Sequence, residues 1–124
     1  MPGLRVLFVE DNILCAFDTC EALRDCGYNV LEVHHAEDAM QVIDSQVQLA
    51  ALVTDVDLGP GADGFDVARA ARLLHPHLPV VYISGTAASR HPAEGVAGSL
   101  FIGKPFYPNQ VAEALDRAIR CEAA

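Results

Sequence analysis

Acidic, hydroxyl and basic side chains stand at the ends of four short apolar runs in this sequence. Glu10 and Asp11 follow the first run, and Asp55 follows the second. Ser84 ends the third run, and Lys104, the only lysine of the chain, follows the fourth. Carboxylate oxygens suit a hard cation such as Mg²⁺, and a hydroxyl and an ammonium suit the oxygens of a phosphoryl group. These residue types together predict phosphoryl chemistry, provided that the fold brings them to one place.

The segments that must position these residues alternate in type. Short apolar runs predict five strands, at 4–9, 28–33, 49–54, 79–84 and 100–103. Apolar residues at three- and four-residue spacing predict helices at 12–26, 36–46, 65–75 and from 108 onward. Residues 85–99 contain Pro92, Gly95 and Gly98, so the helix expected there is short or irregular.

Strands that alternate with helices predict an α/β fold. Its sheet is parallel and carries helices on both faces, through right-handed crossovers. The carboxyl ends of parallel strands open on one edge, where such sheets place their binding sites. Taken singly, an acid after a strand can cap a helix, a serine can form a turn, and a lysine can be a solvated surface charge. Their coincidence at one predicted edge favours a site.

The chemistry expected of that site is transfer of a phosphoryl group to Asp55. A bound Mg²⁺ would offset the repulsion around this carboxylate, which could then attack phosphorus. Lys104 and Ser84 would hold the oxygens of the incoming group. Phosphoryl transfer depends on such positioning and charge neutralisation more than on covalent help from the protein.

The first predicted helix carries a proposed inward face and three of the four cysteines. Ile13, Phe17, Cys20 and Leu23 recur at helical spacing and are expected to face the core. The cysteines form no CxxC pair and lack the spacing of a structural zinc site. We expect all four to be small buried hydrophobes in a reducing compartment; they are Cys15, Cys20, Cys26 and Cys121.

Composition limits the classes of function. With 124 residues, 52% of them hydrophobic, the chain suits one domain, residues 1–124, with one modest core. Its net charge of -9 argues against a nucleic-acid surface, which needs a basic patch. The apolar runs are too short to span a bilayer, and the N-terminus is unlike a signal peptide. We therefore expect a cytoplasmic protein.

The whole chain resembles a receiver domain of the two-component response regulators, a family that includes the chemotaxis regulators. The resemblance implies a flavodoxin-like fold with the strand order 2-1-3-4-5. Its motifs are highly specific in combination and order, although the first of them alone is weak. They are VEDN at 9–12, VTDVDLGPGADGFDVA at 53–68, VVYISGT at 80–86 and LFIGKPF at 100–106.

By that resemblance, Asp55 is the aspartate phosphorylated by a partner histidine kinase or phosphotransfer protein. Glu10 and Asp11 match the acidic pair that positions Mg²⁺, with Asp11 the expected direct ligand. The main-chain carbonyl of Asp57 completes the ligands that the protein supplies.

The resemblance also assigns residues to switching. Ser84 matches the hydroxyl that follows the phosphoryl group, and Phe101 matches the aromatic residue that changes rotamer on activation. Lys104 matches the phosphate-binding lysine, and the Lys104–Pro105 bond is similar to a cis peptide of the family. The altered surface would then bind a downstream protein, which the sequence does not name.

Several alternatives stay open at the level of sequence. Asp57 and Thr86 border the expected site, and their effect on dephosphorylation is not fixed. Asp55 and Asp57 also fit the DxD of a haloacid-dehalogenase-type phosphatase, although that class places the motif after its first strand. A receiver-like binding module that needs no phosphorylation is another possibility. The chain could be a stand-alone regulator or a receiver taken from a hybrid kinase.

Overall fold

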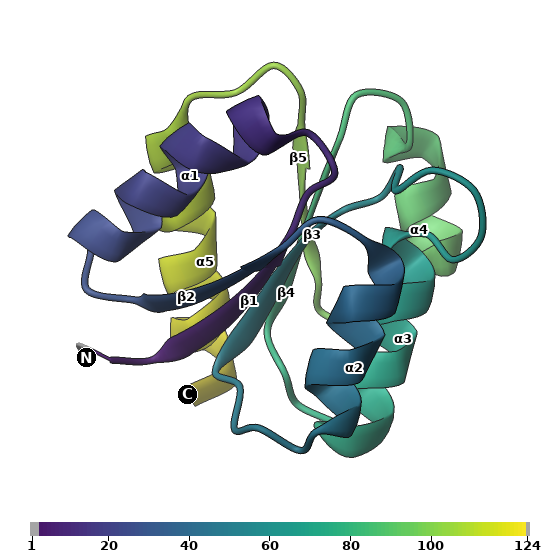
Figure 1. The fold of residues 1–124 in the computed structure, drawn as a ribbon, viewed down its shortest axis with the longest axis horizontal. Coiled ribbons are helices and arrows are strands. Elements are labelled where there is room, and N and C mark those ends of the chain that lie inside the picture. Colours follow the sequence, from purple (N-terminus) through teal and green to yellow (C-terminus); the bar gives the residue numbers. More distant parts are fainter. Residues whose placement is uncertain (1–2, 124) are drawn as a thin grey trace.

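The computed structural model describes residues 3–123, in which five strands alternate with five helices (Figure 1). The strands are β1 (Arg5–Val9), β2 (Asn29–Val33), β3 (Ala51–Asp55), β4 (Val80–Ser84) and β5 (Leu100–Gly103). The helices are α1 (Ile13–Asp25), α2 (Ala36–Asp44), α3 (Gly64–Leu74), α4 (His91–Glu94) and α5 (Pro108–Ala123), and a 3₁₀ turn (Ala88–Arg90) precedes α4. Within the described residues, no helix has the length and apolarity needed to cross a membrane.

The strands form one parallel sheet in the order β2-β1-β3-β4-β5, which confirms the predicted fold class and strand order. Val9 pairs with Thr54 between β1 and β3, so these two strands end almost level. Asp55 pairs with Ile83 between β3 and β4. The strand order reverses between β1 and β3, which is the topological switch point of the sheet. Folds of this kind place their binding sites at the carboxyl ends of the strands beside that point.

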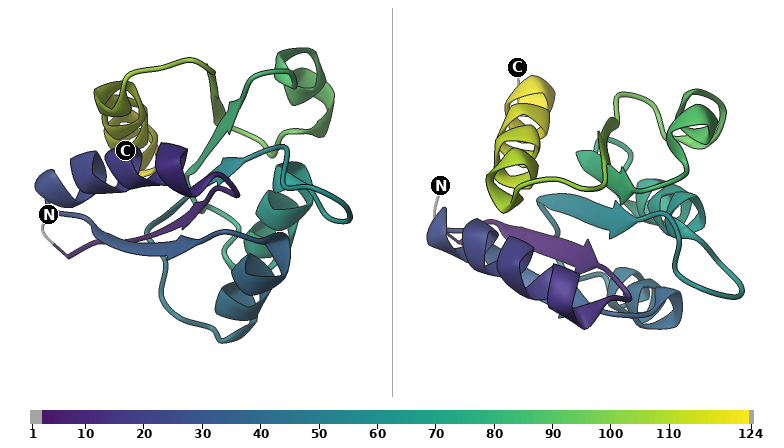
Figure 2. Two further views of the ribbon diagram at one scale, coloured as in Figure 1. Left: turned by 45° about the horizontal axis from the view of Figure 1, so that its top comes forward. Right: turned by 90° about the horizontal axis from the view of Figure 1, so that it is seen from above.

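Helices cover both faces of the sheet (Figures 1 and 2). Successive strand residues point to opposite faces, so each strand contributes to two cores. Leu7 and Val9 pack on the side of α2 and α3, whereas Val6 and Phe8 pack on the side of α1 and α5. Burial on both faces explains why the strands are continuous apolar runs and do not alternate with polar residues.

The predicted inward face of α1 is wrong in its first turns. Ile13 and Phe17 are 64% and 61% exposed, whereas Cys20 and Leu23 are buried as expected. The buried face of α1 includes Ala16 in place of Ile13 and Phe17, which lie to one side of it. Helical spacing identifies residues that share a face, but it does not show which of two overlapping faces meets the sheet.

Burial of all four cysteines is also wrong. Only Cys20 is buried, and Cys15, Cys26 and Cys121 are exposed free thiols. Residues five or six positions apart on a helix point in different directions, so Cys15, Cys20 and Cys26 cannot share one buried face. Burial, together with Glu32, raises the pKa of the Cys20 thiol to about 12.

The fourth helix is short, as the glycines and proline of this segment predict. It has four residues and begins with Pro92 in its first turn. Arginines of α3 hold the segment in place: Arg69 Nη1 donates to the carbonyl of Glu94 at 3.0 Å, and Arg72 Nη2 donates to that of Ala97 at 2.8 Å. Hydrogen bonds from α3 thus fix the conformation of this segment, which has little helix propensity of its own.

Helix α3 begins so close to the end of β3 that its first residue, Gly64, has no room for a side chain. Its amide donates to the carbonyl of Val56 at 2.8 Å, and a Cβ at this position would overlap the backbone of Asp55 and Val56. Gly64→Ala should therefore lower the free energy of unfolding by roughly 1–3 kcal/mol, the usual cost of overpacking. Urea denaturation measures this difference.

Gly103→Ala is the matched control, because a Cβ there meets nothing within 4 Å. It should change the free energy of unfolding by much less than Gly64→Ala. Equal effects of the two substitutions would show that close approach at Gly64 is not the cause.

Candidate functional site

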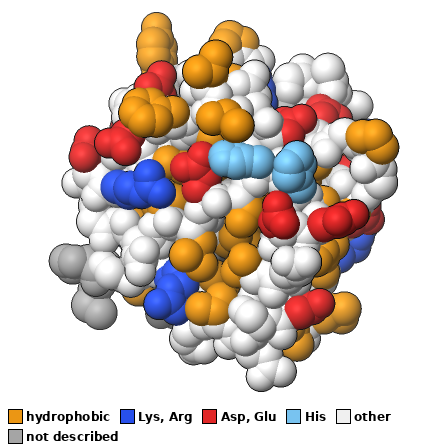
Figure 3. All heavy atoms as spheres, viewed as in Figure 1, with side chains coloured by type: hydrophobic (Ala, Val, Ile, Leu, Met, Phe, Trp, Pro, Cys, Tyr) orange, Lys and Arg blue, Asp and Glu red, His pale blue; other side chains and the backbone are white. Residues whose placement is uncertain are grey.

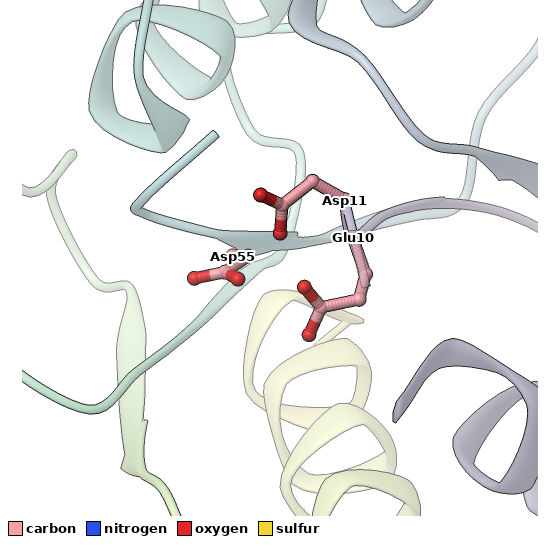
Figure 4. Close-up of side chains that lie close together, drawn as sticks. All are labelled: Glu10, Asp11 and Asp55. Atoms are coloured by element: carbon pink, nitrogen blue, oxygen red, sulfur yellow. The ribbon is translucent and has the colours of Figure 1, made fainter. Parts of the chain in front are cut away.

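The end of β1 supplies two acids and a helix cap. Glu10 extends the sheet by one bond, its amide donating to the carbonyl of Val33 at 3.1 Å. Asn12 then begins α1, and its side chain accepts hydrogen bonds from the amides of Leu14 and Cys15. Capping of α1 therefore falls to Asn12, which leaves the carboxylates of Glu10 and Asp11 for the site (Figure 4).

Asp55 is the last residue of β3, and its side chain is almost fully buried. One carboxylate oxygen, Oδ1, accepts a hydrogen bond from the amide of Asp57 at 3.1 Å. The other, Oδ2, accepts from Lys104 Nζ at 3.0 Å. Both oxygens are thus held in place at the carboxyl edge of the sheet.

Lys104 joins the acids of two strands. Its Nζ lies 2.8 Å from Glu10 Oε1 and 3.0 Å from Asp55 Oδ2. Its backbone amide donates to the carbonyl of Ser84 at 2.9 Å, which places it beside β4. The Lys104–Pro105 peptide is cis. The convergence of the strand ends thus brings the single lysine onto the two buried carboxylates.

Burial shapes the ionisation of this group. Desolvation raises the pKa of Glu10 to about 8, and the neighbouring Asp55 adds to the rise, whereas Lys104 opposes it. Burial alone would lower the pKa of Lys104, but its hydrogen bonds to Glu10 and Asp55 outweigh this and raise the pKa above its usual value. One ammonium does not balance several carboxylates, so the site has a surplus of negative charge.

The acids also lie close enough to share a cation. Oxygen atoms of Glu10, Asp11 and Asp55 lie within 4.8 Å of one another, Glu10 and Asp55 being buried and Asp11 exposed (Figure 4). A donor set of oxygens alone, with one exposed member, fits Mg²⁺, which takes one or two carboxylates and keeps several waters. The residues present therefore fit this ion.

Ser84 and Asp57 are in contact, a link that sequence reasoning missed. Ser84 is buried at the end of β4, and its Oγ donates to Asp57 Oδ2 at 3.1 Å. Thr86 Oγ1 donates to the same oxygen at 3.1 Å. A signal was present in the sequence: Asp57 and Thr86 each stand two residues after a strand-end site residue.

Phe101 lies on β5, next to the segment that contains α4. Its side chain is half-buried and packs against the core on the side of α2 and α3. Its ring centroid lies 5.5 Å from that of His91. A change of rotamer at Phe101 stays a prediction, as does a metal-binding role for the main-chain carbonyl of Asp57.

The raised pKa of Glu10 predicts how stability depends on pH in the metal-free protein. The folded state binds this proton more tightly than the unfolded state, in which the pKa is near 4.5. The stabilisation is fully present below pH 4.5 and is lost as pH rises toward about 8. The free energy of unfolding, measured in chelator, should fall across this window by up to about 1.4 kcal/mol per pH unit.

Asp55→Asn removes a charge that helps to raise the pKa of Glu10. The variant should show a flatter pH dependence and, near neutral pH, be more stable than the parent by about 1 kcal/mol. Asp44→Asn, at an exposed acid that ends α2, serves as the control and should keep the parent's slope. A parent stability that does not fall across the window would contradict the buried-carboxyl account.

Comparison with known proteins gives related sequences and folds. The sensor protein TorS of Escherichia coli is 33% identical over 68% of this chain, and the chain spans only 9% of the length of TorS. A response regulator receiver protein from Sinorhizobium medicae is 31% identical, with a TM-score of 0.93 and 97% of both chains covered.

A third structure adds a fold-level likeness. It is the receiver domain of the sensor histidine kinase PA1611 from Pseudomonas aeruginosa, described with a magnesium ion coordinated in its active site cleft. That structure is 24% identical, has a TM-score of 0.79, and the match covers 95% of this chain and 98% of that one. At this identity, the likeness shows the fold alone.

The model of the response regulator receiver domain matches residues 6–116 and thus takes in the carboxyl ends of all five strands. The recognised motifs, the order of the sheet and this match agree, and the chain belongs to the receiver domain family of two-component response regulators.

Proposed function

We propose that this chain, as a single receiver domain, accepts a phosphoryl group on Asp55 from a phosphohistidine. An oxygen of Asp55 forms a bond to phosphorus while the bond from phosphorus to the donor's imidazole nitrogen breaks, and the electron pair leaves with that nitrogen. The carrying observation is the position of Lys104 Nζ, within 3.0 Å of both Asp55 Oδ2 and Glu10 Oε1. It supplies positive charge beside the carboxylate that would take the group.

Glu10, Asp11, Asp55 and the main-chain carbonyl of Asp57 would hold Mg²⁺. When bound, the ion would neutralise charge that otherwise repels an incoming phosphoryl group. The surplus of carboxylates over ammonium at the site supports this assignment. The magnesium described for PA1611 is consistent with it.

Lys104, Ser84 and Phe101 would couple phosphorylation to the surface. The ammonium of Lys104 and the hydroxyl of Ser84 would both bind phosphoryl oxygens. As Ser84 moves toward that group, the ring of Phe101 would exchange between exposed and buried rotamers. This is a population shift between two states, and the altered surface would bind a downstream protein.

The proposed donor is a sensor histidine kinase or a phosphotransfer protein. An apolar patch of Ile13, Leu14 and Phe17 is exposed at the start of α1. It adjoins a hollow of about 650 Å³ that Lys104 and Phe106 also line. Figure 3 shows hydrophobic side chains gathered at this upper edge of the molecule. An apolar surface beside the acceptor suits a partner that must bring its histidine close.

The proposal includes a cytoplasmic location and no nucleic-acid or membrane partner. A net charge of -9 repels phosphate backbones and anionic lipids alike. The chain would act as a phosphoacceptor with Mg²⁺-dependent self-phosphorylation and self-dephosphorylation, and not as an enzyme with a separate substrate. A DxD phosphatase is disfavoured because Asp55 ends the third strand, and not the first.

Incubation with acetyl phosphate and Mg²⁺ should add one phosphoryl group to the protein, because a small acyl phosphate, like phosphohistidine, carries its phosphoryl group on a good leaving group. Intact mass spectrometry measures the gain. Asp55→Asn and the parent in chelator should show none, and Asp44→Asn should label like the parent. Labelling of Asp55→Asn to the same extent as the parent would show that another residue is the acceptor.

Lys104→Ala should still fold and bind Mg²⁺, because the ammonium binds a phosphoryl oxygen and not the metal. Its phosphorylated form should, however, keep the Phe101 ring signals of the unphosphorylated protein in NMR spectra. Lys104→Arg, which keeps a cation at the site, should restore part of the change. A loss of Mg²⁺ affinity by about an order of magnitude in Lys104→Ala would show that this role is misassigned.

A further inference from the structure

Ser84 has no free hydrogen-bonding capacity in this structure. Its one hydroxyl proton is donated to Asp57 Oδ2 at 3.1 Å. Its oxygen accepts two hydrogen bonds, from the amides of Thr86 and Ala87, both at 3.1 Å. A hydroxyl offers one donor and two acceptor positions, so all three are in use. Ser84 can therefore bind a new acceptor only by giving up Asp57.

Asp57 occupies the position of a competing anion. Its Oδ2 accepts from the hydroxyls of both Ser84 and Thr86, and these bonds to a carboxylate are charge-assisted. Its backbone amide meanwhile donates to Asp55 Oδ1 at 3.1 Å. The residue thus contacts the phosphoacceptor through its main chain and the switch serine through its side chain.

We propose that Asp57 and Thr86 form a latch that holds the Ser84 hydroxyl in the unphosphorylated protein. A phosphoryl group on Asp55 must replace the Asp57 carboxylate as the acceptor of this hydroxyl. Only then can the loop at 84–87 change its conformation. Asp57 is then a positioning residue that sets the threshold for switching. The inference rests on the proposed function for its second half, whereas the latch itself exists without phosphorylation.

The loop after β4 explains how the latch would act beyond Ser84. Ala87 is buried, and its amide depends on Ser84 Oγ for a hydrogen bond. The loop leads into the 3₁₀ turn and α4, whose His91 ring lies beside Phe101. Release of Ser84 from Asp57 would weaken the hydrogen bonds that these two amides donate to Ser84 Oγ. The start of the segment that packs on Phe101 would then be held less firmly.

The first test uses metal-free, unphosphorylated protein and hydrogen exchange measured by NMR. Asp57→Ala should speed exchange of the Thr86 and Ala87 amides by about tenfold, because their acceptor Ser84 loses its anchor. Asp57→Asn, which keeps a neutral acceptor, should fall in between. Asp11→Ala removes the same charge from the site and should leave these two amides protected.

Two results of this exchange test would overturn the latch. One is unchanged protection of Thr86 and Ala87 in Asp57→Ala. The other is an equal loss of protection in Asp11→Ala, since that would make the effect one of charge alone. Neither result depends on whether Asp55 is a phosphoacceptor.

The second test measures binding of beryllofluoride with Mg²⁺, as a phosphoryl mimic, in a double-mutant cycle. Asp57→Ala should tighten binding by about tenfold in the parent, and Thr86→Val should tighten it by less. In a Ser84→Ala background the gain from Asp57→Ala should shrink, because no hydroxyl remains to be released.

A gain of equal size in both backgrounds would show that Asp57 acts only as a repelling charge, and would overturn the proposal. Absence of binding in the parent and in every variant would overturn the proposed function and the switching half of this inference with it. The exchange experiment would still decide whether the latch exists.

Discussion

Burial of like charges at the carboxyl edge of the sheet is the constraint on which this structure depends. β1 and β3 are parallel neighbours, so the carboxylates that follow them are brought together by the same hydrogen bonds that build the sheet. Glu10 and Asp55 are both buried, and Lys104 is the cation shared between them. Burial and the neighbouring Asp55 raise the pKa of Glu10, so this arrangement should cost stability where Glu10 is ionised, a cost that proteins keep where a site needs it.

Much of this arrangement could be predicted from the sequence, because it follows from topology. The end of a strand is marked by a change from apolar to polar residues, and parallel strands end on one side. The placement of Asp55, Ser84 and Lys104 at one edge can be predicted without knowledge of side-chain conformation. The order of the strands came instead from the resemblance of the motifs, since alternation alone does not fix it.

What could not be predicted depends on how one element is turned against another. Ile13 and Phe17 have the spacing of a buried face but lie to one side of the residues of α1 that meet the core. The segments on either side of β4 are also held by hydrogen bonds that leave no periodic pattern in the sequence. Arg72 donates to the carbonyls of Leu78 and Ala97, and any residue could supply a carbonyl. Such contacts appear only once the backbone is placed.

The contact between Asp57 and Thr86 lies between these two cases. Each residue stands two positions after a strand end, and β3 and β4 are neighbours in the sheet, so both must leave it on the same side. Topology brings them near one another, but the choice of partner is chemical. A carboxylate facing two hydroxyls accepts from both, whereas an apolar side chain at 57 would leave the hydroxyl proton of Ser84 without this acceptor. The same sheet edge can therefore hold the Ser84 hydroxyl tightly or loosely, according to one side chain that lies outside the core.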